Sequence, residues 1–146
     1  MDNINFTNSG TSNIIVHALR LKSGDDLFKS IQQYAIQKNI HAGVIISCVG
    51  SLQEINIRLA NADKFLVKKE HFEIVSLVGC FGCSGRYHFH ISVSDSEGNT
   101  KGGHLKENNI VYTTAEIVLG ELPQLSFTAV NNPGEDWPEL QIKNSK

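Results

Sequence analysis

The chain has 146 residues, of which 40% are hydrophobic and 19% charged, so it is long enough for one domain with its own core. Polar or charged residues interrupt every apolar run, which argues against a membrane protein. The formal charge of −2 argues against a dominant nucleic-acid surface, because a domain that neutralises many phosphates needs a basic patch. The local basic cluster of Lys64, Lys68 and Lys69 is interpreted as a solvated strand edge.

The amino-terminal residues 1–12 are polar and acidic, without a basic start or an apolar segment. They predict a short disordered arm and not a signal peptide. The three cysteines are an odd number, and Cys48 lies inside an apolar run, which favours a reducing compartment. Together these features predict a cytoplasmic protein.

The first predicted elements are a strand and a helix. Residues 13–21 alternate in polarity, which predicts a strand, and residues 23–26 form a turn with N-cap oxygens. Helical spacing then relates five residues, Leu27, Phe28, Ile31, Tyr34 and Ala35. Asn39 is suited to a left-handed helix terminus. We therefore expect one amphipathic helix of three to four turns, and no later segment shows a comparable pattern.

The rest of the chain predicts strands. Residues 42–49 form a continuous apolar run, typical of a strand buried on both faces, and Gly50 and Ser51 are expected to end it. Residues 55–59 alternate as a half-buried strand should. Further strands are expected at 65–67, 71–80, 87–94, 100–105, 110–119 and 125–130, with a last short one within 135–142. The simplest fold is one α/β domain of the α+β type over residues 13–142, with a largely antiparallel sheet and a tail at 143–146.

Two histidines on the strand predicted at 87–94 carry the clearest chemical signal. Side chains alternate along a strand, so His88 and His90 point to one face while Phe89 and Ile91 point to the other. Their Cα atoms should lie about 6.5–7 Å apart, close enough for two imidazoles to bind one metal ion.

A third histidine, His104, follows the loop at 95–99 and is preceded by Gly102 and Gly103. A hairpin at this loop would bring His104 beside the first pair, and the glycines would allow close backbone approach. Three imidazoles without an evident fourth side chain are typical of an open site, with water or substrate in the remaining position.

Other interpretations of these residues stay open. His88 and His90 could be no more than a polar sheet face, and His17, His41 and His71 are interpreted as structural or surface residues. A closed metal site could instead use Cys80 and Cys83 together with His88 and His90. The alternative for the two cysteines is a purely structural or surface role.

Six segments in this order resemble the PPC (plants-and-prokaryotes-conserved) domain, and the resemblance runs from about residue 14 to residue 142. The segments are LRLKSGDDLFKSIQQYA, GVIISCVGSL, FEIVSLVG, YHFHISVSD, GGHL and TAEIVLGEL. The resemblance implies a compact domain that assembles as a homotrimer. It also implies a metal ion, zinc in the first instance, held by His88, His90 and His104.

In plant nuclear proteins the PPC domain follows AT-hook motifs, and this chain has no Arg-Gly-Arg-Pro hook. We therefore expect only weak, non-specific DNA binding. The function predicted is a trimeric metal-binding domain, with a metal-dependent hydrolase or lyase as its possible activity and Ser92, Ser94 and Glu73 as candidate partners of the ligands. The alternative is a non-enzymatic oligomerisation or regulatory module, associated with DNA as in AT-hook proteins.

Overall fold

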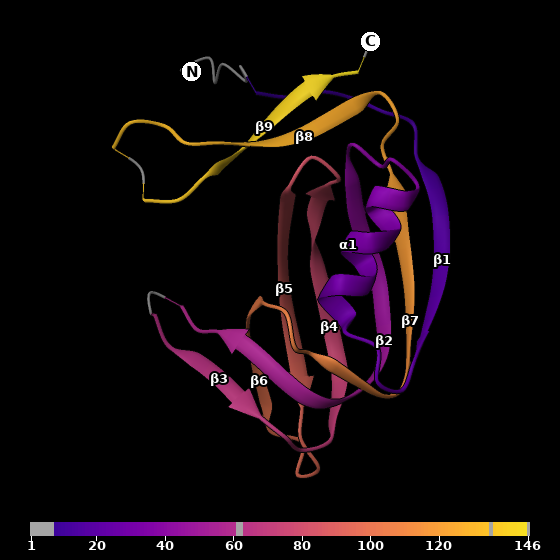
Figure 1. Cartoon of the computed structure of the whole chain (residues 1–146), viewed down its shortest axis with the longest axis vertical. Helices are drawn as coiled ribbons and strands as arrows, with labels where there is room; N and C mark the ends of the chain where they lie inside the picture. The colour runs from indigo at the N-terminus through magenta and orange to yellow at the C-terminus, as the bar shows by residue number, and fades with distance from the viewer. Residues whose placement is uncertain (1–7, 61–62, 135, 146) are drawn as a thin grey trace, which may run out of the picture.

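An antiparallel sheet with a single helix against one face forms the body of the protein (Figure 1). Figure 1 shows the computed structural model, which describes residues 8–60, 63–134 and 136–145. The elements in chain order are β1 (Ile15–Lys22), α1 (Leu27–Gln37), β2 (Gly43–Arg58), β3 (Phe65–Lys68), β4 (Phe72–Gly82), β5 (Arg86–Ser94), β6 (Thr100–Leu105), β7 (Ile110–Glu121), β8 (Leu125–Val130) and β9 (Glu139–Asn144). This confirms a single, mostly antiparallel domain with one helix.

The strand order of the main sheet is β1-β7-β2-β4-β5-β6, and β3 pairs with the end of β2. The far end of β2 also pairs with β6, where Ile57 lies opposite Leu105 and Arg58 opposite His104. The sheet therefore folds back on itself at this end. The segment at 125–130 was expected to complete this sheet, and that expectation is wrong, because β8 pairs with β9 in a separate two-stranded sheet.

The helix begins and ends where the sequence predicts. Asp26 is the N-cap, and its side chain accepts a hydrogen bond from the backbone N–H of Lys29 at 3.1 Å. Asn39 adopts the left-handed conformation with a φ of 54°, two residues after the last helical residue. The spacing of the apolar residues places Leu27, Ile31 and Ala35 on the face that packs against the sheet, where all are fully buried.

Two expectations for the apolar run at 42–49 are corrected. Gly50 does not end the strand, because β2 continues through it to Arg58 with a register shift after Gly50. Gly50 has a φ of 144°, and a Cβ there would lie 2.1 Å from the carbonyl oxygen of Thr114, so only glycine lets the strand pass. The run is also not buried on both faces, since Ile46 is 49% exposed and Val49 57% exposed.

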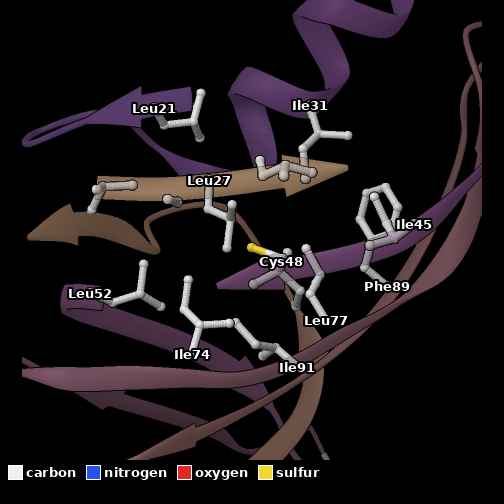
Figure 2. Close-up of a cluster of buried hydrophobic side chains, with 14 of the residues drawn as sticks. Leu21, Leu27, Ile31, Ile45, Cys48, Leu52, Ile74, Leu77, Phe89 and Ile91 are labelled. Carbon is white, nitrogen blue, oxygen red and sulfur yellow. The ribbon is translucent and has the colours of Figure 1, made fainter. Parts of the chain in front are cut away.

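The core lies between α1 and the inner face of the sheet. Figure 2 shows Leu27 and Ile31 from the helix above Ile45, Cys48 and Leu52 of β2, with Leu77, Phe89 and Ile91 contributed by β4 and β5. Phe89, Ile91 and Val93 are buried, as the alternation of residues 87–94 predicts. The intervening side chains of β5 therefore lie on the outer face of the sheet.

The β8–β9 pair is joined to the main sheet near the start of β2. The backbone N–H of Phe127 donates to the carbonyl of His41 at 2.9 Å. Asn8 bonds to β9 through the carbonyl of Leu140 and the N–H of Ile142, both at 2.7 Å. The arm predicted at residues 1–12 therefore has contacts to β9 at Asn8, while residues 1–7 lie outside the described residues. The strand β9 extends to Asn144, two residues past the domain boundary expected at 142. In the described part of the chain, no helix is long and apolar enough to cross a membrane.

Candidate metal centre

His88 and His90 lie side by side on the outer face of β5. The strand pairs with β4 so that His88 is opposite Cys80 and His90 is opposite Val78. Phe89, between the two histidines, is fully buried in the core, which forces both imidazoles outward. The two Nε2 atoms are 3.3 Å apart, so the rings converge as the sequence predicts.

The β5–β6 hairpin adds His104 to this pair. Its loop is tightened by Asp95, whose Oδ1 accepts hydrogen bonds from the N–H groups of Glu97 at 3.1 Å and Asn99 at 2.9 Å. The resulting register sets His104 directly opposite His90. One ring nitrogen from each histidine lies within 4.8 Å of the others, and the ring centroids are 5.0–5.7 Å apart.

The geometry of the three rings fits a tetrahedral metal ion. Two nitrogens bound to one zinc at about 2.0–2.1 Å are about 3.3–3.4 Å apart when they subtend the tetrahedral angle. The Nε2 atoms of His88 and His90 already have this separation, 3.3 Å. The Nδ1 atom of His104 is buried without a hydrogen-bond partner among the described residues, which is costly unless another group binds there. The residues present therefore fit a metal ion with at least one further coordination position.

Burial and positive charge favour the neutral form of two of the imidazoles, those of His88 and His104. The pKa of His104 is lowered from 6.5 to about 4, first by burial and then by Lys106, Arg58 and the other two histidines. The pKa of His88 is also lowered, first by burial and then by Arg86, His90 and Arg58. A neutral imidazole is the form that binds a metal ion, and at neutral pH the lowered pKa values keep His88 and His104 in that form.

Several charged and aromatic residues around the centre were not found from the sequence. A cavity of about 500 Å³ borders His88 and His104, and Arg58, Arg86, Lys106 and Trp137 are among the residues that line it. Arg86 and Lys106 could have been noticed, since each lies two residues from a ligand in the sequence. Arg58 and Trp137 come from distant parts of the chain, and only the β2–β6 pairing and the loop before β9 bring them here.

The residues predicted to hydrogen-bond to the ligand histidines do not all lie near them. Nη2 of Arg86 lies 3.1 Å from Nδ1 of His88, so an arginine occupies the place expected for a serine or a carboxylate. This contact is given up when Nε2 of His88 binds a metal ion, because Nδ1 then carries the ring proton. Glu73 lies opposite Ser94 in the β4–β5 register. Ser94 is four residues from His90 along β5, which is about 13 Å at the usual strand rise, so both lie away from the cluster. Only Ser92, two residues from His90 on the same face, lies next to the cluster.

The two cysteines of the proposed closed site point in different directions. Cys80 lies opposite His88 and lines a shallow cavity with His88 and His90. The sulfur of Cys83 is instead 3.6 Å from Nδ1 of His41 and 3.9 Å from Oδ1 of Asn39. Among the described residues, the three histidines are the one group of three or more potential ligands within metal-binding distance, and it includes neither thiol.

The remaining histidines and lysines have structural or surface contacts. His17 bridges the hydroxyl of Tyr34 at 3.0 Å and the carboxylate of Glu121 at 3.1 Å. His71 stacks on Tyr112 with ring centroids 3.8 Å apart. The lysines near β3 are paired with acids at the surface, Lys68 with Glu70 at 2.9 Å and Lys69 with Glu54 at 3.4 Å.

Comparison with solved structures shows the same fold in other proteins. A hypothetical protein from Salmonella cholerae-suis is 33% identical, with a TM-score of 0.89 over 92% of this chain and 97% of that chain. A metal-containing protein from Archaeoglobus fulgidus is 22% identical, with a TM-score of 0.70 over 92% and 97% of the two chains. A Bacteroides thetaiotaomicron protein whose name suggests DNA binding is 21% identical, with a TM-score of 0.73 over 94% and 96%. The last two likenesses show the fold alone.

Sequence comparison identifies the family. The bifunctional protein GlmU of Synechococcus sp. strain JA-3-3Ab is 37% identical over 133 residues, which are 91% of this chain and 21% of that protein. The chain thus spans about a fifth of the length of this curated relative. Residues 8–123 match the Plants and Prokaryotes Conserved (PCC) domain, the family that the six sequence segments resemble. The chain therefore belongs to the Plants and Prokaryotes Conserved domain family.

Proposed function

We propose that this domain binds one divalent transition-metal ion, with zinc preferred, through His88, His90 and His104. The observation that carries the proposal is the convergence of three ring nitrogens within 4.8 Å, with two of them at the 3.3 Å separation of a tetrahedral edge. The metal-containing relative from Archaeoglobus fulgidus supports it at the level of the fold. Imidazole also suits copper, nickel and iron, so the ligands are better supported than the choice of zinc.

The open coordination position leads to a metal-dependent hydrolase or lyase as the proposed activity. A metal ion held by three histidines supplies an activated water molecule or polarises a substrate oxygen. The chain's own contribution is to hold the imidazoles of His88 and His104 neutral by burial and nearby positive charge, which lower the pKa of both groups. The strand pairings to β4 and β6 hold the rings in place.

We further propose that the domain works as a homotrimer. Five branched aliphatic side chains on β1, β2 and β4 are 49–59% exposed and supply apolar surface that a second subunit would cover: Val16, Ile46, Val49, Val75 and Val78. Val78 lies opposite His90 on this outer face, so the apolar surface adjoins the histidines. Light scattering should return three times the chain mass of 16.1 kDa, and a monomer at micromolar concentrations would contradict the trimer.

Metal uptake by purified, untagged protein tests the proposal. Elemental analysis should find one zinc per chain, and zinc should rebind after chelation. Replacing a residue that only hydrogen-bonds to a metal ligand weakens metal binding by about 10–100-fold, so we expect more than about 100-fold weaker binding when His88, His90 or His104 itself is replaced by Ala. The control variants are His41→Ala and His71→Ala, because both side chains are exposed and lie outside the cluster. Equal zinc binding by all five variants would refute the metal centre.

The second candidate is a non-enzymatic assembly or regulatory module, and the exposed aliphatic face of the sheet favours it. An association with DNA would fit the name of the Bacteroides thetaiotaomicron relative. The formal charge of −2 favours weak, salt-sensitive DNA binding. A protein that forms trimers but takes up no metal would support this candidate, and a sequence-specific nanomolar DNA complex at physiological salt would support its DNA-associated form.

A further inference from the structure

The cavity beside the histidine cluster collects positive charge from three separate elements. Arg58 ends β2, Arg86 begins β5, and Lys106 follows β6, and all three line the same cavity of about 500 Å³. The chain has three arginines in all, and two of them lie here. The positive charge therefore comes from positions 20 or more residues apart that folding brings together.

No carboxylate neutralises these cations in the described part of the chain. The ion pairs described there join other residues, and no Asp or Glu is among the described residues that line the cavity. Their charge reaches the imidazoles, since Arg58 and Lys106 both lower the pKa of His104. An unpaired cluster of this kind gains most from a ligand that brings negative charge.

Both guanidinium groups are held by neutral partners. Arg86 donates from Nη1 to the carbonyl of Pro138 at 3.0 Å, and its Nη2 lies 3.1 Å from Nδ1 of His88. When Nε2 of His88 binds a metal ion, Nδ1 carries the ring proton, so Nη2 is then free to donate to an anion. Arg58 lies against the indole ring of Trp137, with 4.9 Å between its guanidinium carbon and the ring centroid. Because each guanidinium has five N–H donors, both keep donors for a further acceptor, in the planar arrangement that matches carboxylate and phosphate oxygens.

The rest of the cavity wall is suited to an apolar group. Tyr87, Ala129, Trp137 and Pro138 line it together with Gly85. Trp137 is 63% exposed, a large apolar surface that a bound molecule would cover. The wall thus combines oxyanion recognition at one side with aromatic and aliphatic contact at the other.

We propose that this cavity binds a small organic anion, with its carboxylate or phosphate group between Arg58, Arg86 and Lys106 and its apolar body against Trp137. The inference rests on the proposed function, because it names the ligand class of the same centre. A divalent ion beside three cations is repelled by them, and an anion in the cavity offsets that repulsion. Metal and anion therefore strengthen each other's binding by the same factor.

Four probes test the chemistry: benzoate, phenyl phosphate, inorganic phosphate and the uncharged benzamide. Binding to zinc-loaded and chelated protein is measured by calorimetry and by the emission of Trp137, the single tryptophan of the chain. We expect benzoate or phenyl phosphate to bind at least tenfold more tightly than benzamide and to shift the emission. The better of the two identifies the anionic group, and inorganic phosphate should bind more weakly than phenyl phosphate because it lacks the apolar body.

The arginine variants locate the site. Arg58→Gln and Arg86→Gln should each weaken anion binding at least tenfold, because each removes at least one charge-assisted hydrogen bond to the anion. Arg20→Gln is the matched control, because Arg20 is exposed on β1 and does not line the cavity. Should Arg86→Gln fail to fold, Lys106→Gln replaces it. The inference would be overturned if neither benzoate nor phenyl phosphate bound more tightly than benzamide, or if the variants bound the anion with unchanged affinity.

Zinc content, determined on the same samples, separates the two proposals. If the protein retains zinc but binds no anion, the anion pocket is contradicted and the metal centre is not. Anion binding by a protein that takes up no metal supports the pocket and contradicts the metal centre.

Discussion

Asn109 holds together the strand ends that carry His104, although it lies outside the cluster. It is a fully buried polar residue between β6 and β7. Its Oδ1 accepts from the N–H of Asn56 at 3.0 Å, and its Nδ2 donates to the carbonyls of Asn56 at 2.9 Å and Lys106 at 2.7 Å. Asn56 precedes the β2 residues that pair with β6, so this side chain fixes β2 against the segment that follows His104.

Replacing Asn109 by Ala removes all three hydrogen bonds. The carbonyl of Asn56 keeps the N–H of Lys106 at 3.3 Å, whereas the N–H of Asn56 and the carbonyl of Lys106 lose the partners described above. At about 1–2 kcal/mol for each orphaned group, we expect a loss of about 2–4 kcal/mol in the free energy of unfolding. With a urea m-value of about 2 kcal/mol/M, the unfolding midpoint falls by about 1–2 M.

Urea unfolding followed by circular dichroism measures this loss, and zinc affinity is measured on the folded variant. Asn109→Asp is the matched variant, because it keeps the volume and one acceptor but turns a carboxylate toward two carbonyls. It should be at least as destabilising as Ala. A loss below about 1 kcal/mol for both variants would refute the reasoning, because the buried backbone groups would then have found other partners.

Three further predictions concern single features. Gly50→Ala should cost at least about 2 kcal/mol in unfolding experiments because its Cβ meets backbone at 2.1 Å, whereas Gly24→Ala, with φ of 88° and open space, should cost about 1 kcal/mol. The thermal stability of metal-free protein should fall as pH drops from 6.5 toward 4. The reason is that folding lowers the pKa of His104 to about 4, so the unfolded chain takes up the proton first. His104→Asn should flatten this pH dependence, and an unchanged dependence would contradict the attribution to His104. The double variant Cys80→Ser with Cys83→Ser should keep nearly full zinc affinity, and its loss of zinc, with the histidine variants unaffected, would establish the closed site instead.

The features that the sequence predicted well are local. Period-two alternation placed Phe89 in the core and therefore His88 and His90 together on the outer face, because neighbouring side chains of a strand point to opposite sides. The acidic turn and apolar spacing located α1, with Asp26 as its cap and Asn39 past its end. In each case the residues involved lie within a few positions of one another.

The errors arose where a residue's role depends on a distant strand. Gly50 was expected to end a strand, but it crosses Thr114 of β7 so closely that glycine instead allows the strand to continue. The run around Ile46 suggested burial on both faces, yet in the single chain one face is open. Hydrophobicity alone does not distinguish residues of a core from residues of a subunit interface.

The sequence by itself determined the strand face of His88 and His90, the hairpin that returns His104 to them, and the limits of the helix, because short-range backbone periodicity and turn chemistry decide all three. The tertiary structure alone decided that Arg58 lies opposite His104, and that Trp137 lies against Arg58. These neighbours are separated by more than 40 residues, and their meeting depends on sheet register and on the path of the loop before β9. Their positive charge and aromatic surface are what turn a three-histidine cluster into a cavity suited to an organic anion.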